Sequence, residues 1–93
     1  MRGMISDIFD ASAWAPVEPF AFEDINPQAP THVLIIPKKH IIDIKEAQPE
    51  DAELIGYCHL VAAKIARERG IEDGYRTVYN VGPGAGQSVF HLH

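Results

Sequence analysis

Two histidines near the end of the sequence have the spacing of residues that act together. His91 and His93 are separated by one residue in segment 88–93, which reads SVFHLH. If this segment is a strand, its period of two places both imidazoles on one face, with Cα atoms about 7 Å apart. Imidazoles that titrate near neutral pH can serve as a nucleophile and as a proton carrier. Two exposed histidines on a solvated face, or two ligands of a metal site, are the alternative interpretations.

A glycine-rich loop, NVGPGAGQS over residues 80–88, precedes the two histidines. Its three glycines allow backbone N–H groups to approach a phosphate closely, and Gln87 and Ser88 add side-chain donors. The loop lacks the Gly-Lys-Ser/Thr ending of a Walker loop, and it is not a dinucleotide fingerprint ahead of a helix. It therefore indicates either a phosphate site or an ordinary hairpin loop.

Earlier in the chain, several polar residues have both a structural and a functional interpretation. His32 lies at the head of an apolar strand, where it is either a structural histidine or one that orients another imidazole. Asp24 lies in a turn, where it either caps its own backbone or accepts hydrogen bonds from two sugar hydroxyls. The basic cluster at 38–40 is interpreted as a solvated turn, and Cys58 as a core residue of a helix.

The first part of the chain contains patterns for two strands that would position these residues. Segment 20–30, FAFEDINPQAP, predicts a short strand that runs into a turn. The four aliphatic residues at 33–36 predict a central strand that is covered on both faces and ended by Pro37. Segment 41–47, IIDIKEA, predicts a connector anchored by its isoleucines.

One helix and two further strands are predicted after the connector. A helix is predicted over 49–69 because Pro49 suits its first position, acidic residues follow, and apolar residues recur at steps of three and four. Gly70 is the expected C-terminal cap. Segments 75–80 and 88–93 are rich in β-prone or alternating residues and predict an antiparallel hairpin.

Composition limits the possible classes of function. The 93 residues make one domain, whose core is thin enough to benefit from an oligomer. A net charge of −5 excludes a basic nucleic-acid-binding surface at the level of the whole chain. The single cysteine excludes an intrachain disulfide and a Cys-based zinc site, and it fits a cytoplasmic, reducing setting. The acidic start is unlike a signal peptide, and no apolar run approaches the length of a membrane span.

Together and in this order, these segments resemble the histidine triad family, closest to its HINT branch of purine nucleoside phosphoramidases. The matching stretches are FAFEDINPQAPTHVLIIPKKHI, the helix and GYRTVYNVGPGAGQSVFHLH. The resemblance implies an α+β domain over 20–93, with an antiparallel sheet that is shortened at both chain ends and one main helix. An irregular N-terminal arm is expected over 1–19. The family usually forms homodimers.

The resemblance also implies a reaction and a set of site residues. The family hydrolyses or transfers nucleoside monophosphates, such as those of nucleoside phosphoramidates, at the α-phosphate through a nucleotidyl-histidine, and it needs no cofactor or metal. By position, His93 matches the nucleophile, His91 the first histidine, which orients the site, and His32 the upstream histidine that hydrogen-bonds into the cluster. The other matches are Asp24 for ribose, Phe22 and Ile25 for the base, Ser88 for the leaving group, and Asn80, Gly86 and Gln87 around the phosphate.

The sequence departs from the family pattern after His93. The third histidine of the triad would lie two residues further on, where this sequence has already ended. That histidine contacts phosphate oxygens in the family, so a chain without it is expected to lose a donor worth about 2–4 kcal/mol of barrier. A carboxylate at His93 is expected to repel an incoming phosphate. The alternatives are therefore a catalytically impaired nucleotide-binding or interaction module, and a metal site on His91 and His93.

Overall fold

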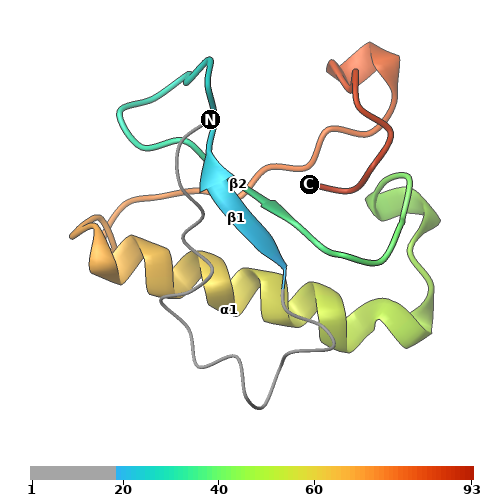
Figure 1. The fold of residues 1–93 in the computed structure, drawn as a ribbon, viewed down its shortest axis with the longest axis horizontal. Coiled ribbons are helices and arrows are strands. Elements are labelled where there is room, and N and C mark those ends of the chain that lie inside the picture. The colour runs from blue at the N-terminus through green and yellow to red at the C-terminus, as the bar shows by residue number, and fades with distance from the viewer. Residues whose placement is uncertain (1–18) are drawn as a thin grey trace.

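The computed structural model describes residues 19–93, and the expected N-terminal arm lies almost entirely outside this range. Its strands and its α-helix all lie before residue 70 (Figure 1). In chain order the elements are β1 (Phe20–Glu23), β2 (Val33–Ile36), the short 3-10 helices Ile44–Glu46 and Pro49–Asp51, α1 (Ala52–Glu68) and a third 3-10 turn, Pro83–Ala85. The α+β class predicted from the sequence is confirmed.

The two strands form an antiparallel pair on which α1 packs. Phe20 lies opposite Ile36 and Glu23 opposite Val33, and the helix runs across one side of this pair (Figure 1). The core between them consists of four buried residues, with Val33 and Ile35 packed against it: Ala21, Tyr57, Val61 and Ile65. The three helix residues of this core are spaced by four, so they lie along one face of α1.

The predicted helix is confirmed, with a tighter first turn than a regular α-helix. Pro49–Asp51 is a 3-10 turn that leads directly into α1. The Asp51 carboxylate accepts a hydrogen bond from the Gln48 backbone N–H (2.9 Å) and another from the Lys39 ammonium (2.5 Å). At the other end, Gly70 has a φ of 69°, the left-handed conformation that ends many helices.

The prediction of a central strand at 33–36 is wrong in one respect. The strand at 33–36 exists and ends before Pro37, but among the described residues it pairs only with β1. All four of its residues are half-buried. Its second edge faces the cavity described below, and so it has no strand neighbour on that side within residues 19–93.

The predicted hairpin of 75–80 and 88–93 is also wrong, because neither segment is a strand. A strand needs a ladder of backbone hydrogen bonds with a neighbour, and no backbone hydrogen bond joins these two segments within the described chain. The loop between them instead closes on itself, since the N–H groups of Ala85 and Gln87 both donate to the Gly82 carbonyl. The β-prone composition of these segments indicated strands, but neither segment has a strand partner among residues 19–93.

A second apolar cluster holds the end of the chain against the rest of the molecule. Ile41, Leu54 and Leu92 are buried together. The Leu92 N–H also donates to the Ile41 carbonyl at 2.6 Å, so the connector after β2 and the last residues lie side by side. Ile42, which was also expected as an anchor, is 44% exposed. No helix within residues 19–93 is both long and apolar enough to cross a membrane.

Candidate active site

A cavity of about 480 Å³ lies between β2, α1 and segment 75–80. Its polar lining includes four of the residues singled out from the sequence: Asp24, His32, Asn80 and His93. Residues of β2 and α1 supply most of its apolar wall. A volume in this range and a wall of this kind are typical of small-molecule sites, in which a few polar groups fix the orientation of the ligand.

Asp24 and His32 are placed next to each other by the ends of the two strands. The Asp24 backbone N–H donates to the His32 carbonyl (2.9 Å), which extends the β1–β2 ladder by one step. One carboxylate oxygen, Oδ1, accepts from the Asn26 N–H (2.8 Å), as expected for an aspartate that caps a turn. The other, Oδ2, lies 3.5 Å from His32 Nε2.

These contacts also determine which nitrogen of His32 carries a proton. Nδ1 lies 3.0 Å from the Gln28 backbone N–H, which can only donate. Nδ1 is therefore the acceptor, and Nε2 carries the hydrogen of the neutral ring. That N–H faces Asp24 at the wall of the cavity. None of the hydrogen bonds of His32 within the described chain reaches His91 or His93.

His93 is held in the tautomer that a nucleophile requires. Its Nδ1 lies 2.8 Å from the backbone carbonyl of His91, and a carbonyl oxygen can only accept. Nδ1 therefore carries the hydrogen, and in the neutral ring Nε2 keeps its lone pair. The side chain is half-buried and lines the cavity.

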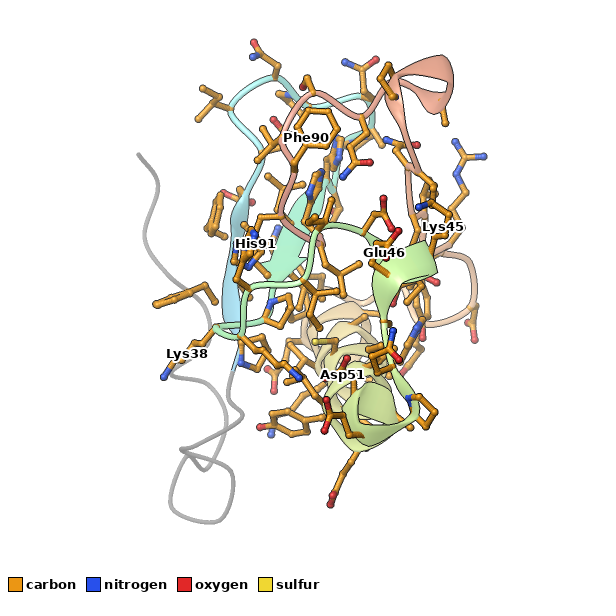
Figure 2. The ribbon with its side chains drawn as sticks, turned by 90° about the vertical axis from the view of Figure 1, so that its right-hand side faces the viewer. Lys38, Lys45, Glu46, Asp51, Phe90 and His91 are labelled. Atoms are coloured by element: carbon orange, nitrogen blue, oxygen red, sulfur yellow. The ribbon has the colours of Figure 1, made fainter. Side chains whose placement is uncertain are left out.

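His91 turns away from the cavity, although only one residue separates it from His93. Its Nε2 donates to the Pro37 carbonyl (2.8 Å), and its Nδ1 lies 3.4 Å from Nδ1 of His40. The two rings meet edge to face, with centroids 5.1 Å apart. Figure 2 shows His91 beside the connector that follows β2, with Lys38 pointing outward from the same connector. The two histidines therefore do not share a strand face.

The glycine-rich loop is organised by the buried side chain of Gln87. Its amide oxygen accepts from the Gly82 N–H (2.7 Å), and its NH₂ group donates to the carbonyls of Ile42 (2.9 Å) and Val89 (3.2 Å). Gly82 and Gly86 have φ values of 76° and 88°, which only glycine adopts at low cost. Both polar ends of Gln87 are hydrogen-bonded to backbone groups, and the bond to Ile42 anchors the loop to the connector after β2.

The other residues expected from the family pattern lie outside the cavity wall. Ser88 and Gly86 are exposed, Ile25 is 72% exposed, and Phe22 is half-buried on β1. Asn80 is exposed at the cavity edge. The structure thus brings together His32, Asp24, Asn80 and His93 and leaves the rest of the set apart.

Two side chains that the sequence did not single out line the cavity on the helix side. Tyr79 Oη and His59 Nε2 are hydrogen-bonded at 2.9 Å. Burial raises the pKa of the Tyr79 hydroxyl. Cys58, next to His59, also lines the cavity, and burial raises the pKa of its thiol to about 11, so it is a thiol at neutral pH. His40 was interpreted from the sequence as part of a solvated turn, but its ring contacts His91.

Among residues 19–93 no group of three or more His, Cys, Asp and Glu side chains could hold a metal ion. His91 and His93 donate to different carbonyl groups rather than converging on one point. The metal interpretation of this pair therefore has no third ligand in the described part of the chain.

Comparisons with known proteins agree with the pattern found in the sequence. The model of the HIT domain matches residues 16–93. An uncharacterized HIT-like protein of Synechococcus elongatus is 49% identical over 73 residues, which cover 78% of this chain and 64% of that protein. A 14 kDa zinc-binding protein of Zea mays is 51% identical over 75 residues, which cover 78% of this chain and 59% of that protein.

A solved structure shows the same fold. The crystal structure of a HIT family hydrolase from Legionella pneumophila matches with a TM-score of 0.76 and 50% sequence identity. The match covers 78% of this chain and 66% of that one. The chain therefore spans about two thirds of the length of the proteins that it resembles.

Proposed function

The chain belongs to the histidine triad (HIT) family, and from its cavity we propose a nucleotide-binding hydrolase or transferase. The proposed substrates are nucleoside 5′-phosphoramidates, with a purine base, or related nucleotide conjugates. The bond cleaved is that between the α-phosphorus and the leaving group. The observation that carries this proposal is the tautomer of His93, whose Nε2 lone pair belongs to a side chain in the wall of a cavity of about 480 Å³.

The polar groups around the cavity suit the parts of a nucleotide. The Asp24 carboxylate is an acceptor for ribose hydroxyls, as acids are in other nucleotide sites. The Asn80 amide is a donor for the phosphate oxygens, and the His32 Nε2–H, which faces Asp24, orients that carboxylate. Because no lysine or arginine other than Arg76 lines this cavity, donors of this kind must supply most of the phosphate stabilisation within the described chain.

The chemical step follows from the two nitrogens of His93. Nε2 attacks the α-phosphorus, a P–N bond forms, and the bond to the departing amine breaks as the amine takes up a proton from solvent water. The imidazole becomes positively charged in this step, and its Nδ1–H then donates more strongly to the His91 carbonyl. Water hydrolyses the nucleotidyl-histidine to release the nucleoside monophosphate and the free imidazole.

The direct experiment is turnover of an adenosine 5′-phosphoramidate that carries a fluorescent amine, at neutral pH without added metal. We expect amine release by the protein and none above background by His93→Ala. The control is Lys45→Ala, which removes an exposed side chain that does not line the cavity. Equal release by the protein and by His93→Ala would refute catalysis through His93.

Binding without turnover is the alternative, and the same samples distinguish it. A catalytically impaired nucleotide-binding module would bind adenosine monophosphate in a calorimeter but release no amine. Loss of binding in Asp24→Ala, with no amine release by the unaltered protein, would support that alternative.

A homodimer and a cytoplasmic location are part of the same proposal. Large apolar side chains are exposed on α1 and on segment 75–80, namely Leu60 (63%) and Val78 (58%). Burying such groups in a second copy would stabilise a small core. We expect a dimer by light scattering at micromolar concentration, and a monomer throughout a dilution series in that range would contradict it.

A further inference from the structure

Three consecutive contacts connect the connector after β2 to His93. His40 Nδ1 meets His91 Nδ1 (3.4 Å), His91 Nε2 meets the Pro37 carbonyl (2.8 Å), and His93 Nδ1 meets the His91 carbonyl (2.8 Å). Only the last of these belongs to the proposed nucleophile itself. The first two hold the residue whose carbonyl selects the tautomer of His93.

The positions of the hydrogens along this series of contacts follow from the contact between His91 and the Pro37 carbonyl. A carbonyl oxygen only accepts, so His91 Nε2 must carry a hydrogen. Neutral His91 therefore has its lone pair on Nδ1, and the His40 nitrogen that faces it must be the donor. His40 in its Nδ1–H form is thus the partner that His91 requires, although 3.4 Å is at the long end for such a bond.

From this arrangement we propose that His40 is a positioning residue for His93, acting through His91. The proposal rests on the proposed function for its catalytic consequence, but its structural part does not. With His40 in place, the His91 ring is held at both nitrogens, and its backbone carbonyl points at His93 Nδ1. Without it, the His91 ring is held at one nitrogen only, and the direction of the His91 carbonyl then depends on the Leu92 N–H bond to Ile41 in the same peptide unit.

The neighbouring contacts hold the same peptide unit from its other side, next to the contacts of the His91 ring. Leu92 is anchored by its N–H to the Ile41 carbonyl and by burial against Ile41 and Leu54. Residues 40 and 41 therefore hold residues 91 and 92, one pair through side chains and one through the backbone. Removing the hydrogen-bond partners that orient metal-ligating imidazoles typically costs about 10- to 100-fold in metal affinity or activity, and we take the lower end of that range as the scale for His40.

The test compares two amide substitutions at one position. The side-chain amide of His40→Asn places a donor near the site of Nδ1, whereas that of His40→Gln reaches nearer the site of Nε2. We expect His40→Ala and His40→Gln to lose about tenfold in kcat with KM changed less than about twofold, and His40→Asn to recover most of the loss. Lys38→Ala is the control, because its side chain points outward from the same connector (Figure 2).

A second readout does not depend on turnover. Long-range ¹⁵N–¹H correlation spectra of the free protein report which imidazole nitrogen carries hydrogen. We expect His93 to be mainly the Nδ1–H form in the unaltered protein and in His40→Asn, and to become a mixture of tautomers in His40→Ala.

Unchanged His91 and His93 tautomers in His40→Ala would overturn the proposal, whatever the kinetics show. If the unaltered protein releases no amine, the proposed function fails while the spectra still decide the role of His40. If His40→Ala proves unstable, the contrast between the Asn and Gln variants, both amides, decides it in the same spectra.

Discussion

The sheet and helix of residues 20–68 are held by apolar packing and ladder hydrogen bonds, whereas residues 71–93 are held by single polar contacts together with one small apolar cluster around Leu92. In the first region Ala21, Val61 and Ile65 are buried against one another. In the second, Gln87 and His91 reach the backbone of a different part of the chain. The difference shows that one small protein can have a scaffold whose stability comes from packed side chains and a site region whose geometry depends on individual hydrogen bonds.

The largest effect on stability is expected when a buried side chain of the scaffold is shortened. Ile65→Ala should lower the free energy of unfolding by about 2–5 kcal/mol, because it removes buried methyl groups that the core cannot replace. Leu60→Ala, on the exposed side of the same helix, should change it by less than about 0.5 kcal/mol. Urea unfolding followed by circular dichroism measures both. Similar losses in the two variants would show that α1 is not packed as described.

A smaller and local effect is expected from the anchor of the glycine-rich loop. The carboxylate of Gln87→Glu can accept from the Gly82 N–H but cannot donate to the Ile42 and Val89 carbonyls. Unpaired polar groups of this kind cost about 1–3 kcal/mol. Amide hydrogen exchange should speed up over residues 82–93 while α1 stays protected.

A second substitution at the same position sharpens that prediction. Gln87→Ala leaves the Ile42 and Val89 carbonyls and the Gly82 N–H unpaired but adds no buried charge, so it should disturb the loop less than Gln87→Glu. Exchange that rises equally in α1 and in the loop would contradict a site region held independently of the scaffold.

The smallest effect is expected at the ion pair between the connector and the start of the helix. The Lys39 ammonium, followed by the Gln48 N–H, holds the pKa of the Asp51 carboxyl below its usual value of 3.8. A lowered pKa in the folded state contributes stability above the unfolded pKa, and this is lost as pH falls through the folded value. Asp51→Asn should therefore lower Tm at pH 7 and lower it by less at about pH 2. A Tm difference that is the same at both pH values would contradict this.

How much could be predicted from the sequence differs between the same two regions. The helix was predictable because Tyr57, Val61 and Ile65 follow its period, and Pro49 and Gly70 mark its limits. The strands β1 and β2 were predictable from their apolar runs and from the turn between them. Local period and end signals are sufficient where each element packs on its neighbour.

The site region was predictable in residue type but not in geometry. Alternation in 88–93 indicated a strand, but pairing depends on a neighbour that no local pattern specifies. The Gln87 amide, the His91 contact with Pro37 and the His40 contact are all non-local, separated by 45 or more residues. Nothing in the spacing of His40 indicated its contact with His91.

The central claim is that His93 Nε2 attacks the α-phosphorus, and trapping the intermediate tests it most directly. The protein is mixed with an adenosine 5′-phosphoramidate, stopped within seconds in alkali, digested and analysed by mass spectrometry. The account predicts an acid-labile adenylyl group on the peptide that contains His93, located on His93 by fragmentation and absent from His93→Ala. An adenylyl group on His91 or His32 would contradict it. Amine release with no adduct, or with an adduct that persists in His93→Ala, would also contradict it.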